Sequence, residues 1–435
     1  MISTYPTYKR SDIEWMEYIP SHWDELKGQF LLRKKDCNVG DAWISTQLLS
    51  LTQRGVIKKD INSGKGKTHS DYSTYQFVEN GDLIFCLFDI DETPRTVGLS
   101  SFEGMITSAY SVFEAINGND KKYLYYFFEF VDNCKGLKPY YSGMRKTVRP
   151  TEFLKILLPK PPKTEQKAIA TFLDRETQRI DSLIEEKQTF IKLLKEKRQA
   201  LISHVVTKGL NPNVEMQDSG IEWIGQVPKH WGISKVRYLG QCQNGINIGG
   251  EFFGHGTPFV SYGDVYNNTS LPEKVQGLVL STEKDRDNYS VIAGDVLFTR
   301  TSETIEEIGF SAVCKSTIEQ AVFAGFLIRF RPDEGNLEVG FSEYYFRNEK
   351  LRAFFAKEMN LVTRASLSQD LLKKMPVLLP PIDEQNEIAN YLQAECNKFS
   401  EIFAETEKTI LLLKERRTSL ISAAVTGKID VREAM

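Results

Sequence analysis

The sequence lacks each short motif that would mark it as an enzyme or a metalloprotein. It has no Walker-type GxxxxGKS/T loop, no GxSxG nucleophile elbow, no HExxH helix and no cysteine–histidine spacing suited to a metal. The Gly-rich stretch 245–256 has no strand–GxGxxG–helix context, and the Asn-Pro-Pro-aromatic tetrapeptide of amino-methylating enzymes is missing too. No pair of acidic residues stands out as an acid–base couple. We therefore expect a non-catalytic adaptor.

Paired cysteines and long apolar runs are also missing. The six cysteines are scattered without a CxxC, which favours reduced thiols in a cytosolic protein. No apolar run reaches membrane-spanning length and the N-terminus has no signal-peptide pattern, so no membrane partner is expected. A net charge of −3 excludes a basic protein overall, although a local basic groove would suffice to bind nucleic acid. At 435 residues the chain has room for two or more domains.

What the sequence does contain is a long repeat. The segment Pro161 to Gln166 (PPKTEQ) returns 219 residues later as Pro380 to Gln385 (PPIDEQ). The helical pattern that follows each copy ends in nearly the same sequence, LLKEKR from Leu193 and LLKERR from Leu412. The two copies align over this whole stretch without a gap. Solenoid units are about 20–50 residues long, so this period indicates a duplicated half-molecule.

Each copy is predicted to be one long amphipathic helix, with Thr164 and Asp383 at the N-cap position. Apolar residues recur at near-heptad spacing in the first copy: Ile169, Leu173, Ile180, Leu183, Phe190, Leu194 and Leu201. The matching residues of the second copy are Ile388, Leu392, Phe399, Ile402, Leu413 and Leu420. Such a seam favours pairing of the two copies as a spacer about 60 Å long, rather than two helices of an ordinary helical core.

A second duplicated motif opens each half. An Ile-Glu-Trp segment leads to Pro-x-His-Trp at residues 13–23 and again at residues 221–231. Paired tryptophans beside a proline turn are typical of a packing clamp. The alternative, in which His22 and His230 are ligands or bases, is weak because no further ligands lie near either residue in the sequence.

Between these motifs, a Gly-Asp turn feeds a buried strand in each half, at residues 78–85 and 291–298. The order is therefore globular domain and long helix, twice. We place a first globular domain at 1–160, a first helical spacer at 161–210, a second globular domain at 211–379 and a second helical spacer at 380–435.

The segments 48–77 and 262–289 differ between the halves, as expected if a duplicated scaffold reads two different targets. The first is basic through Arg54, Lys58, Lys59, Lys65 and Lys67. Its polar residues suited to base edges are Gln53, Asn62, Thr68 and His69. A merely soluble, flexible loop is the competing interpretation.

Further basic candidates precede the double prolines. The turn 143–149 contributes Arg145, Lys146 and Arg149. The second divergent segment is nearly balanced in charge, so a DNA contact there would need help from Arg300, Arg329 or Arg364. Each of these three is equally suited to a structural ion pair.

Taken together, the chain resembles a specificity subunit of a Type I restriction–modification system. The resemblance covers nearly the whole chain and depends on the ordered double set of motifs, above all the two PPxxEQ helix openings and the LLKE-K/R-R helix endings. It implies an α+β protein with two α/β target-recognition domains in inverted orientation, held apart by two long antiparallel coiled-coil helices with pseudo-twofold duplication. It identifies no individual base-contacting residue.

The resemblance also implies partners. Each domain would read one half of a bipartite site in double-stranded DNA, the N-terminal domain taking the 5′ half. Two modification subunits would bind S-adenosylmethionine and methylate adenine, and restriction subunits would use ATP, with Mg expected there as well; this chain would hold none of these cofactors. The main alternative is a stand-alone two-domain DNA-binding regulator without methylase partners. A fused restriction–methylation enzyme and a coiled-coil structural protein fit less well, because the first needs methylase motifs and the second needs no divergent domains.

Overall fold

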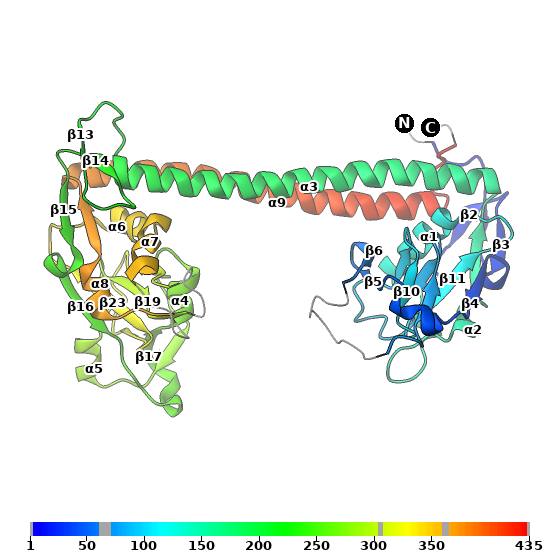
Figure 1. Cartoon of the computed structure of the whole chain (residues 1–435), viewed down its shortest axis with the longest axis horizontal. Coiled ribbons are helices and arrows are strands. Elements are labelled where there is room, and N and C mark those ends of the chain that lie inside the picture. The colour runs from blue at the N-terminus through cyan, green and yellow to red at the C-terminus, as the bar shows by residue number, and fades with distance from the viewer. Residues whose placement is uncertain (1–2, 61–70, 303–307, 359–364, 433–435) are drawn as a thin grey trace. The chain divides into compact units, whose positions relative to one another are not determined.

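A computed structural model of the chain describes residues 3–60, 71–302, 308–358 and 365–432 (Figure 1). The chain forms two compact units. Unit 1 comprises Met1–Lys187 and Glu407–Met435, and unit 2 comprises Gln188–Thr406. Two long helices, α3 (Lys163–Lys208) and α9 (Ile382–Val425), contribute a segment to each unit. No helix among the described residues is long and apolar enough to cross a bilayer.

Unit 1 is built around a four-stranded antiparallel sheet with strand order β4-β11-β8-β9. Its strands are β4 (Leu32–Lys35), β11 (Ser111–Ala115), β8 (Leu83–Phe85) and β9 (Val97–Leu99). Four two-stranded pairs surround it: β1 (Tyr8–Arg10) with β2 (Tyr18–Pro20), β3 (Asp24–Lys27) with β12 (Leu157–Lys160), β5 (Leu49–Thr52) with β6 (Gly55–Lys58), and β7 (Gln76–Val78) with β10 (Gly104–Ile106).

Successive side chains along each strand point to opposite faces of the sheet in unit 1, and both faces are buried. Leu83 and Phe85 pack with Phe113 on the face that also holds α1 (Lys121–Asn133) and α2 (Pro150–Phe153). Ile84 and Val112 lie on the other face, in a cluster with residues of the β5–β6 hairpin and the β7–β10 pair. The hairpin is therefore fixed by apolar packing against the sheet.

Unit 2 repeats this plan with strand order β16-β23-β19-β21. The central strands are β16 (Gly240–Asn244), β23 (Leu327–Pro332), β19 (Val296–Thr299) and β21 (Ser311–Val313). The other strands are β13 (Met216–Asp218), β14 (Gln226–Pro228), β15 (Gly232–Lys235), β17 (Phe253–Val260), β18 (Gly277–Val279), β20 (Thr301–Ser302), β22 (Val322–Phe323), β24 (Ala365–Ser366) and β25 (Pro376–Leu379). The helices are α4 (Tyr262–Asn267), α5 (Glu283–Asn288), α6 (Val339–Phe346), α7 (Glu349–Glu358) and α8 (Gln369–Lys374).

The predicted Gly-Asp turns are confirmed in both units. Gly81 and Gly294 have φ of 99° and 91°, values that favour glycine, and they precede β8 and β19. The Asp82 carboxylate accepts from the Glu79 N–H at 2.7 Å, and Asp295 does the same for Ile292 at 2.9 Å. Each turn is thus closed by its own aspartate before the buried strand begins.

The two duplicated motifs meet in space. In unit 1 the Glu165 carboxylate of the PPxxEQ motif is buried and accepts a hydrogen bond from Trp23 Nε1 at 2.9 Å. His22 Nε2 lies 2.9 Å from the same carboxylate, and the Tyr5 hydroxyl donates to it. In unit 2 Glu384 takes the same place, with His230 and Trp231 at 2.8 and 3.0 Å. The clamp interpretation is confirmed, and a helix-borne glutamate closes it.

The neighbouring glutamine of each motif ties the long helix to the domain. Gln166 Oε1 accepts from the Asp120 N–H at 2.8 Å, immediately before α1, and Gln385 Oε1 accepts from the Glu338 N–H at 2.8 Å, immediately before α6. Each amide also donates to the carbonyl of the first proline of its motif. The long helix and the domain helix therefore start from a shared anchor.

Two details of the helix predictions are wrong. Helices α3 and α9 begin at Lys163 and Ile382, so Thr164 and Asp383 lie one residue inside the helix and are not N-caps. The double prolines supply the start instead, because they restrict the backbone and leave the helix to begin immediately after them. Phe190 and Ile402, predicted in the seam, are 43% and 39% exposed.

Within each unit, α3 and α9 run antiparallel. In unit 1 Arg417 of α9 pairs with Asp181 of α3. Just after the end of α9, the Gly427 backbone lies against Trp23, which is hydrogen-bonded to Glu165 at the start of α3. In unit 2 Arg198 of α3 lies over the Phe403 ring of α9. The helix ends are buried by the domains, which leaves the middle parts more exposed.

Arg417 also anchors the helices to the domain in unit 1. Its Nη1 lies 2.7 Å from the buried Glu129 carboxylate of α1, and Arg95 Nη2 lies 3.1 Å from the same oxygen. Burial alone would raise the pKa of Glu129, but attraction to Arg417 and Arg95 outweighs it, so the pKa is lowered. A charged carboxylate is thus a structural part of unit 1.

Removing the clamp glutamate tests this organisation. We expect Glu165→Ala to lower the free energy of unfolding of unit 1 by about 2–3 kcal/mol, because the Trp23 and Tyr5 donors are left without an acceptor. The effect of Glu384→Ala on unit 2 should be smaller, since the Glu384 side chain is 22% exposed against 4% for Glu165. Hydrogen exchange measured at increasing urea concentrations would give the stability of each unit separately. Glu186→Ala, at an exposed helix position, is the control; equal losses in all three variants would contradict the assignment.

The Glu129 ion pairs predict an acid-sensitive contribution. The folded pKa of Glu129 lies below its unfolded value of about 4.3, so its contribution is present above that pH and is lost as the pH falls through the folded pKa. We expect Glu129→Gln to destabilise unit 1 by about 3 kcal/mol at pH 7. The free energy of unfolding of this variant should also fall less steeply with decreasing pH than that of wild type. Glu114→Gln, which removes an exposed pair with Arg33, should change little. The prediction would be wrong if the free energy of unfolding fell equally with decreasing pH in wild type and in Glu129→Gln.

Candidate nucleic-acid interface

In unit 1, the loop that follows β8 and the turn 142–147 form one edge of the domain. The Val148 N–H donates to the Leu87 carbonyl at 2.9 Å, and the Asp89 N–H donates to the Arg145 carbonyl at 2.8 Å. Asp89 and Lys146 both adopt positive φ, at 48° and 43°. Two segments that are distant in sequence are thus held together through their backbones.

This edge places two of the predicted DNA-binding residues together. Arg145 pairs with Asp89 at 3.3 Å and Lys146 pairs with Asp91 at 2.9 Å, while both cationic side chains stay exposed to solvent. The Lys146 ammonium lowers the pKa of Asp91. Arg145 also lies 5.8 Å from the centroid of the Phe88 ring. The edge therefore offers cations for phosphates and carboxylate acceptors beside them.

Arg149 lies just beyond this turn, as the residue preceding α2. Its side chain is exposed, and it forms no ion pair within the described part of unit 1. It is therefore available to a phosphate without displacing a carboxylate.

The β5–β6 hairpin carries the other basic residues of unit 1. Arg54 lies exposed in the turn at its tip, where its N–H donates to Thr52 Oγ1 at 3.2 Å. Lys58 lies at the other end, over the Phe102 ring at 5.0 Å, and with Lys59 lines a cleft of about 500 Å³ that includes Asp60. No contact joins these lysines to the Arg145 turn among the described residues. Lys65, Lys67 and Thr68, with Asn62 and His69, lie outside the described residues.

In unit 2, Arg300 follows β19 at the place that Leu87 takes after β8. Its carbonyl accepts from the Leu367 N–H at 2.7 Å, as the Leu87 carbonyl accepts from Val148 in unit 1. The Arg300 side chain is half-buried and has no ion pair in the described part of unit 2. Arg364 lies outside the described residues.

Arg329 has a structural role, but through hydrogen bonds and a ring contact, without the ion pair suggested by the sequence among the described residues of unit 2. It is 6% exposed, donates to the Ser290 carbonyl and to Gln243, and lies over the Phe323 ring at 5.3 Å. Burial lowers the pKa of its guanidinium. Arg329 is therefore part of the core and is not a DNA contact.

Sequence reasoning missed two exposed side chains on the loops that meet near Arg300 and Gly325. Phe326 is 63% exposed, and its carbonyl accepts from the Arg300 N–H at 2.9 Å. Asn247 is exposed in the Gly-rich segment, against Gly325. The only signal in the sequence was the glycine content of that segment, which was tested against a dinucleotide site alone.

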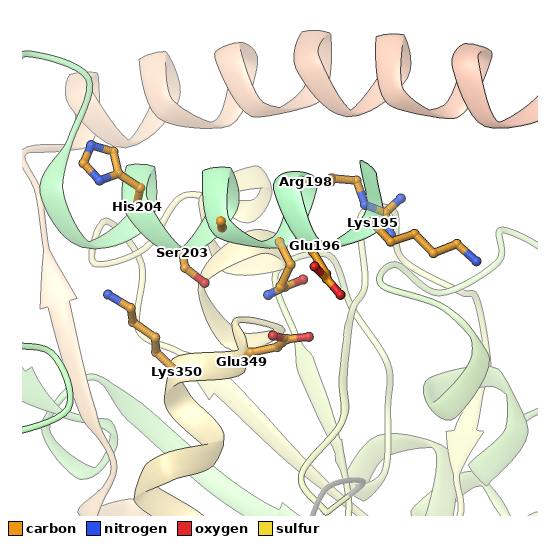
Figure 2. A pocket seen from close by; sticks show the side chains of 9 residues that line it. Lys195, Glu196, Arg198, Ser203, His204, Glu349 and Lys350 are labelled. Carbon is orange, nitrogen blue, oxygen red and sulfur yellow. The ribbon is translucent and has the colours of Figure 1, made fainter. Parts of the chain in front are cut away.

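A different cleft lies in unit 2 between α3 and the start of α7, with a volume of about 680 Å³ (Figure 2). Its lining mixes the cationic Lys195, Arg198 and Lys350 with Glu196 and Glu349. Figure 2 shows both carboxylates on the cleft side of their helices. A wall of mixed sign is a poor surface for a polyanion, so this cleft is not assigned to DNA. No group of three or more potential metal ligands occurs in the described parts of the chain.

The comparisons with known proteins decide the family. Residues 26–193 and 243–411 match the Type I restriction modification DNA specificity domain. The chain belongs to this family. The two matches follow the internal duplication, and each covers the sheet of one unit and a segment of a long helix.

Individual relatives agree with this assignment. The Type I restriction enzyme EcoKI specificity subunit of Escherichia coli K12 is 25% identical over 66% of this chain and 60% of its own length. The putative type I restriction enzyme MjaX specificity subunit of Methanocaldococcus jannaschii is 23% identical over 47% of each chain. This chain thus spans about 60% or less of the length of these curated relatives.

Two solved structures share the fold. One, described as the structural basis of complex assembly and conformational transition of the type I R-M system, superposes with a TM-score of 0.70 at 15% identity and covers 94% of this chain and 99% of its own. The HsdS subunit from Thermoanaerobacter tengcongensis gives a TM-score of 0.52 at 15% identity, covering 94% and 98%. The expected fold class is thereby confirmed, and the central four-stranded sheet of each unit is antiparallel.

The Arg145 turn gives a prediction specific to electrostatics. We expect Arg145→Ala with Lys146→Ala to weaken DNA binding and to reduce the slope of log K against log salt concentration by about 0.9 for each phosphate that is no longer neutralised. Fluorescence anisotropy across a salt series measures both. Lys155→Ala removes an exposed lysine that pairs only within its own turn and is the matched control. An unchanged salt slope in the double variant would remove these residues from the interface.

Proposed function

We propose that this chain is the DNA-recognition subunit of a Type I restriction–modification complex. Each unit reads one half of a bipartite site in double-stranded DNA, and partner subunits carry out adenine methylation and cleavage. The observation that carries the proposal is a duplicated scaffold with two different edges. The sheet, clamp and helix anchor are shared, whereas the edge of unit 1 presents Arg145 and Lys146 and that of unit 2 presents Arg300.

The partners in this proposal are two modification subunits and the restriction subunits. Exposed apolar side chains on the long helices support protein partners: in unit 2 these include Phe190, Leu193 and Ile402, at 43%, 56% and 39% exposure. S-adenosylmethionine, ATP and Mg belong to the partners in this scheme. The chain itself would be non-catalytic and cytoplasmic, which fits its six free cysteines.

Binding by two units on one chain has a physical consequence. Once one unit has engaged its half-site, the second binds at an effective concentration set by the connection between the units, so the bipartite site is bound more tightly than either half. A stand-alone regulator would share this property. It would, however, have no need of exposed apolar helix faces, so the regulator is the less favoured alternative.

Adenine-methylation mapping tests the proposal. DNA from cells with this chain and its modification subunit is compared with DNA from cells lacking the chain. We expect a bipartite methylated motif that disappears without the chain, and replacement of residues 1–160 by those of another family member should change one half only.

Co-purification separates the two candidate functions. A recognition subunit should be isolated with a methylase, whereas a regulator should bind its site alone. The absence of any methylated motif, from a chain shown to be folded and bound to an active modification subunit, would contradict the proposal.

A further inference from the structure

Three loops of unit 2 converge at one edge of its sheet. The Gly-rich segment after β16 contacts the turn before β23, where the Ile246 N–H donates to the Phe323 carbonyl at 2.9 Å. The Arg300 N–H donates to the Phe326 carbonyl at 2.9 Å. One exposed asparagine, one arginine and one exposed phenylalanine are thereby gathered: Asn247, Arg300 and Phe326.

The backbone at this edge leaves no room for adjustment. A Cβ on Gly245 would lie 2.2 Å from the Ala324 carbonyl oxygen, and a Cβ on Gly325 would lie 2.0 Å from Asn247 Oδ1. Gly245 is therefore required by the close approach of two backbones, whereas Gly325 lies against the end of the Asn247 side chain. The contact at Gly245 fixes the backbone of the Gly-rich segment against the turn before β23, from which Asn247 and Phe326 project.

The side chains at this edge are not used by the fold. The Asn247 amide makes no hydrogen bond with other described residues of unit 2, and Arg300 has no ion pair there. Phe326 is 63% exposed, so most of its ring lies in water. Unused amide, guanidinium and aromatic groups on a rigid frame are typical of a recognition surface.

Unit 1 has an arginine and an aromatic ring at the corresponding edge, from different sequence positions. There Arg145 lies over Phe88, and the Phe88 ring stacks on Tyr110 at 6.1 Å. Tyr110 immediately precedes β11, as Phe326 immediately precedes β23. Each unit thus has an arginine and an aromatic side chain at this edge, although in unit 2 the contact between Arg300 and Phe326 is made by their backbones.

We infer that this edge reads an A·T-containing segment of the half-site bound by unit 2, with Asn247 pairing with the adenine edge and Phe326 packing against a thymine methyl group. An asparagine amide matches the adenine N6 donor and N7 acceptor, and an apolar side chain matches the thymine C5-methyl in the major groove. Arg300, whose N–H is bonded to the Phe326 carbonyl, supplies the cation for a neighbouring guanine or phosphate. This assignment rests on the proposed function and names the bases that the second unit reads.

A protein partner is the other kind of ligand that an exposed phenylalanine suits. The unpaired amide and guanidinium favour DNA, because protein interfaces bury apolar anchors and leave unpaired polar groups at their rims. If the edge binds DNA, the affinity depends on the bases of the half-site. If it binds a protein partner, the affinity for DNA does not depend on those bases, so base analogues distinguish the two.

The test uses the assembled complex of this chain with its modification subunits and base analogues in the half-site. In 7-deaza-adenine the N7 acceptor is missing, and in deoxyuridine the thymine methyl is missing; neither analogue alters the protein. We expect wild type to lose affinity on the order of 10-fold with each analogue at one position of the half-site read by unit 2. Asn247→Ala should lose on the order of 10- to 100-fold on normal DNA but show no further loss with 7-deaza-adenine, and Phe326→Ala should behave likewise with deoxyuridine.

Matched controls lie in the same unit. Asn213→Ala removes an exposed asparagine from the loop after α3, and Tyr238→Ala removes a ring that is 67% exposed, comparable with Phe326. Both should keep wild-type sensitivity to the analogues. Thermal unfolding of each variant confirms that the fold is retained.

The outcomes separate this inference from the function on which it rests. If wild type binds its bipartite site but the two variants bind every probe as wild type does, the inference is overturned while the function stands. Loss of the modification subunit from Phe326→Ala, with unchanged DNA discrimination, would make this edge a protein-docking surface and would also overturn it. If wild type recognises no bipartite DNA at all, the proposed function itself fails.

Discussion

The hydrogen bond between the glutamate of each PPxxEQ motif and a tryptophan is the interaction on which the rest of the fold depends. Glu165 accepts from Trp23 and Glu384 accepts from Trp231, so the first turn of each long helix is fixed to the opening segment of a domain. The next residue, a glutamine, fixes the first domain helix to the same turn. Charge-assisted hydrogen bonds in a desolvated site are strong and directional, so they set the angle at which helix and domain join.

The two copies make the same contacts where the long helices begin, but their contacts differ farther along the helices. In unit 1, Arg417 pairs with Glu129 and Asp181, which ties the last turns of α9 to α1 and α3. The counterpart of Arg417 in unit 2 is Arg198, which lies over Phe403 instead. A buried ion pair costs desolvation and needs both partners, so it is easily replaced in one copy by a contact of similar volume. The two units therefore share a scaffold but differ in whether ion pairs join the long helices to the domain at this position.

The same division applies to the two edges that we propose to face DNA. Both units place a backbone bond at the same point, from Val148 to Leu87 and from Leu367 to Arg300, but the side chains around it differ. In unit 1 the cations are matched by Asp89 and Asp91, so binding a phosphate means exchanging one anion for another. In unit 2 Arg300 has no such counter-ion among the described residues, and its N–H donates to the carbonyl of the exposed Phe326. A constant frame with variable side chains is how one fold comes to read different sequences.

The sequence by itself determined the duplication, the two long helices, the Gly-Asp strands and the family, because each follows from local chemistry or from the repeat. It also identified Arg145, Lys146 and Arg300 as basic candidates, but it ranked Arg329 equally with Arg300. Only the tertiary structure separated those two, since burial of Arg329 depends on Gln243 and Ser290, which are distant in sequence. The meeting of His22 with Glu165, and of Asn247 with Gly325, was likewise decided by packing. Periodicity and turn chemistry act over a few residues, whereas burial and partner choice are set by contacts across the whole chain, which no local pattern encodes.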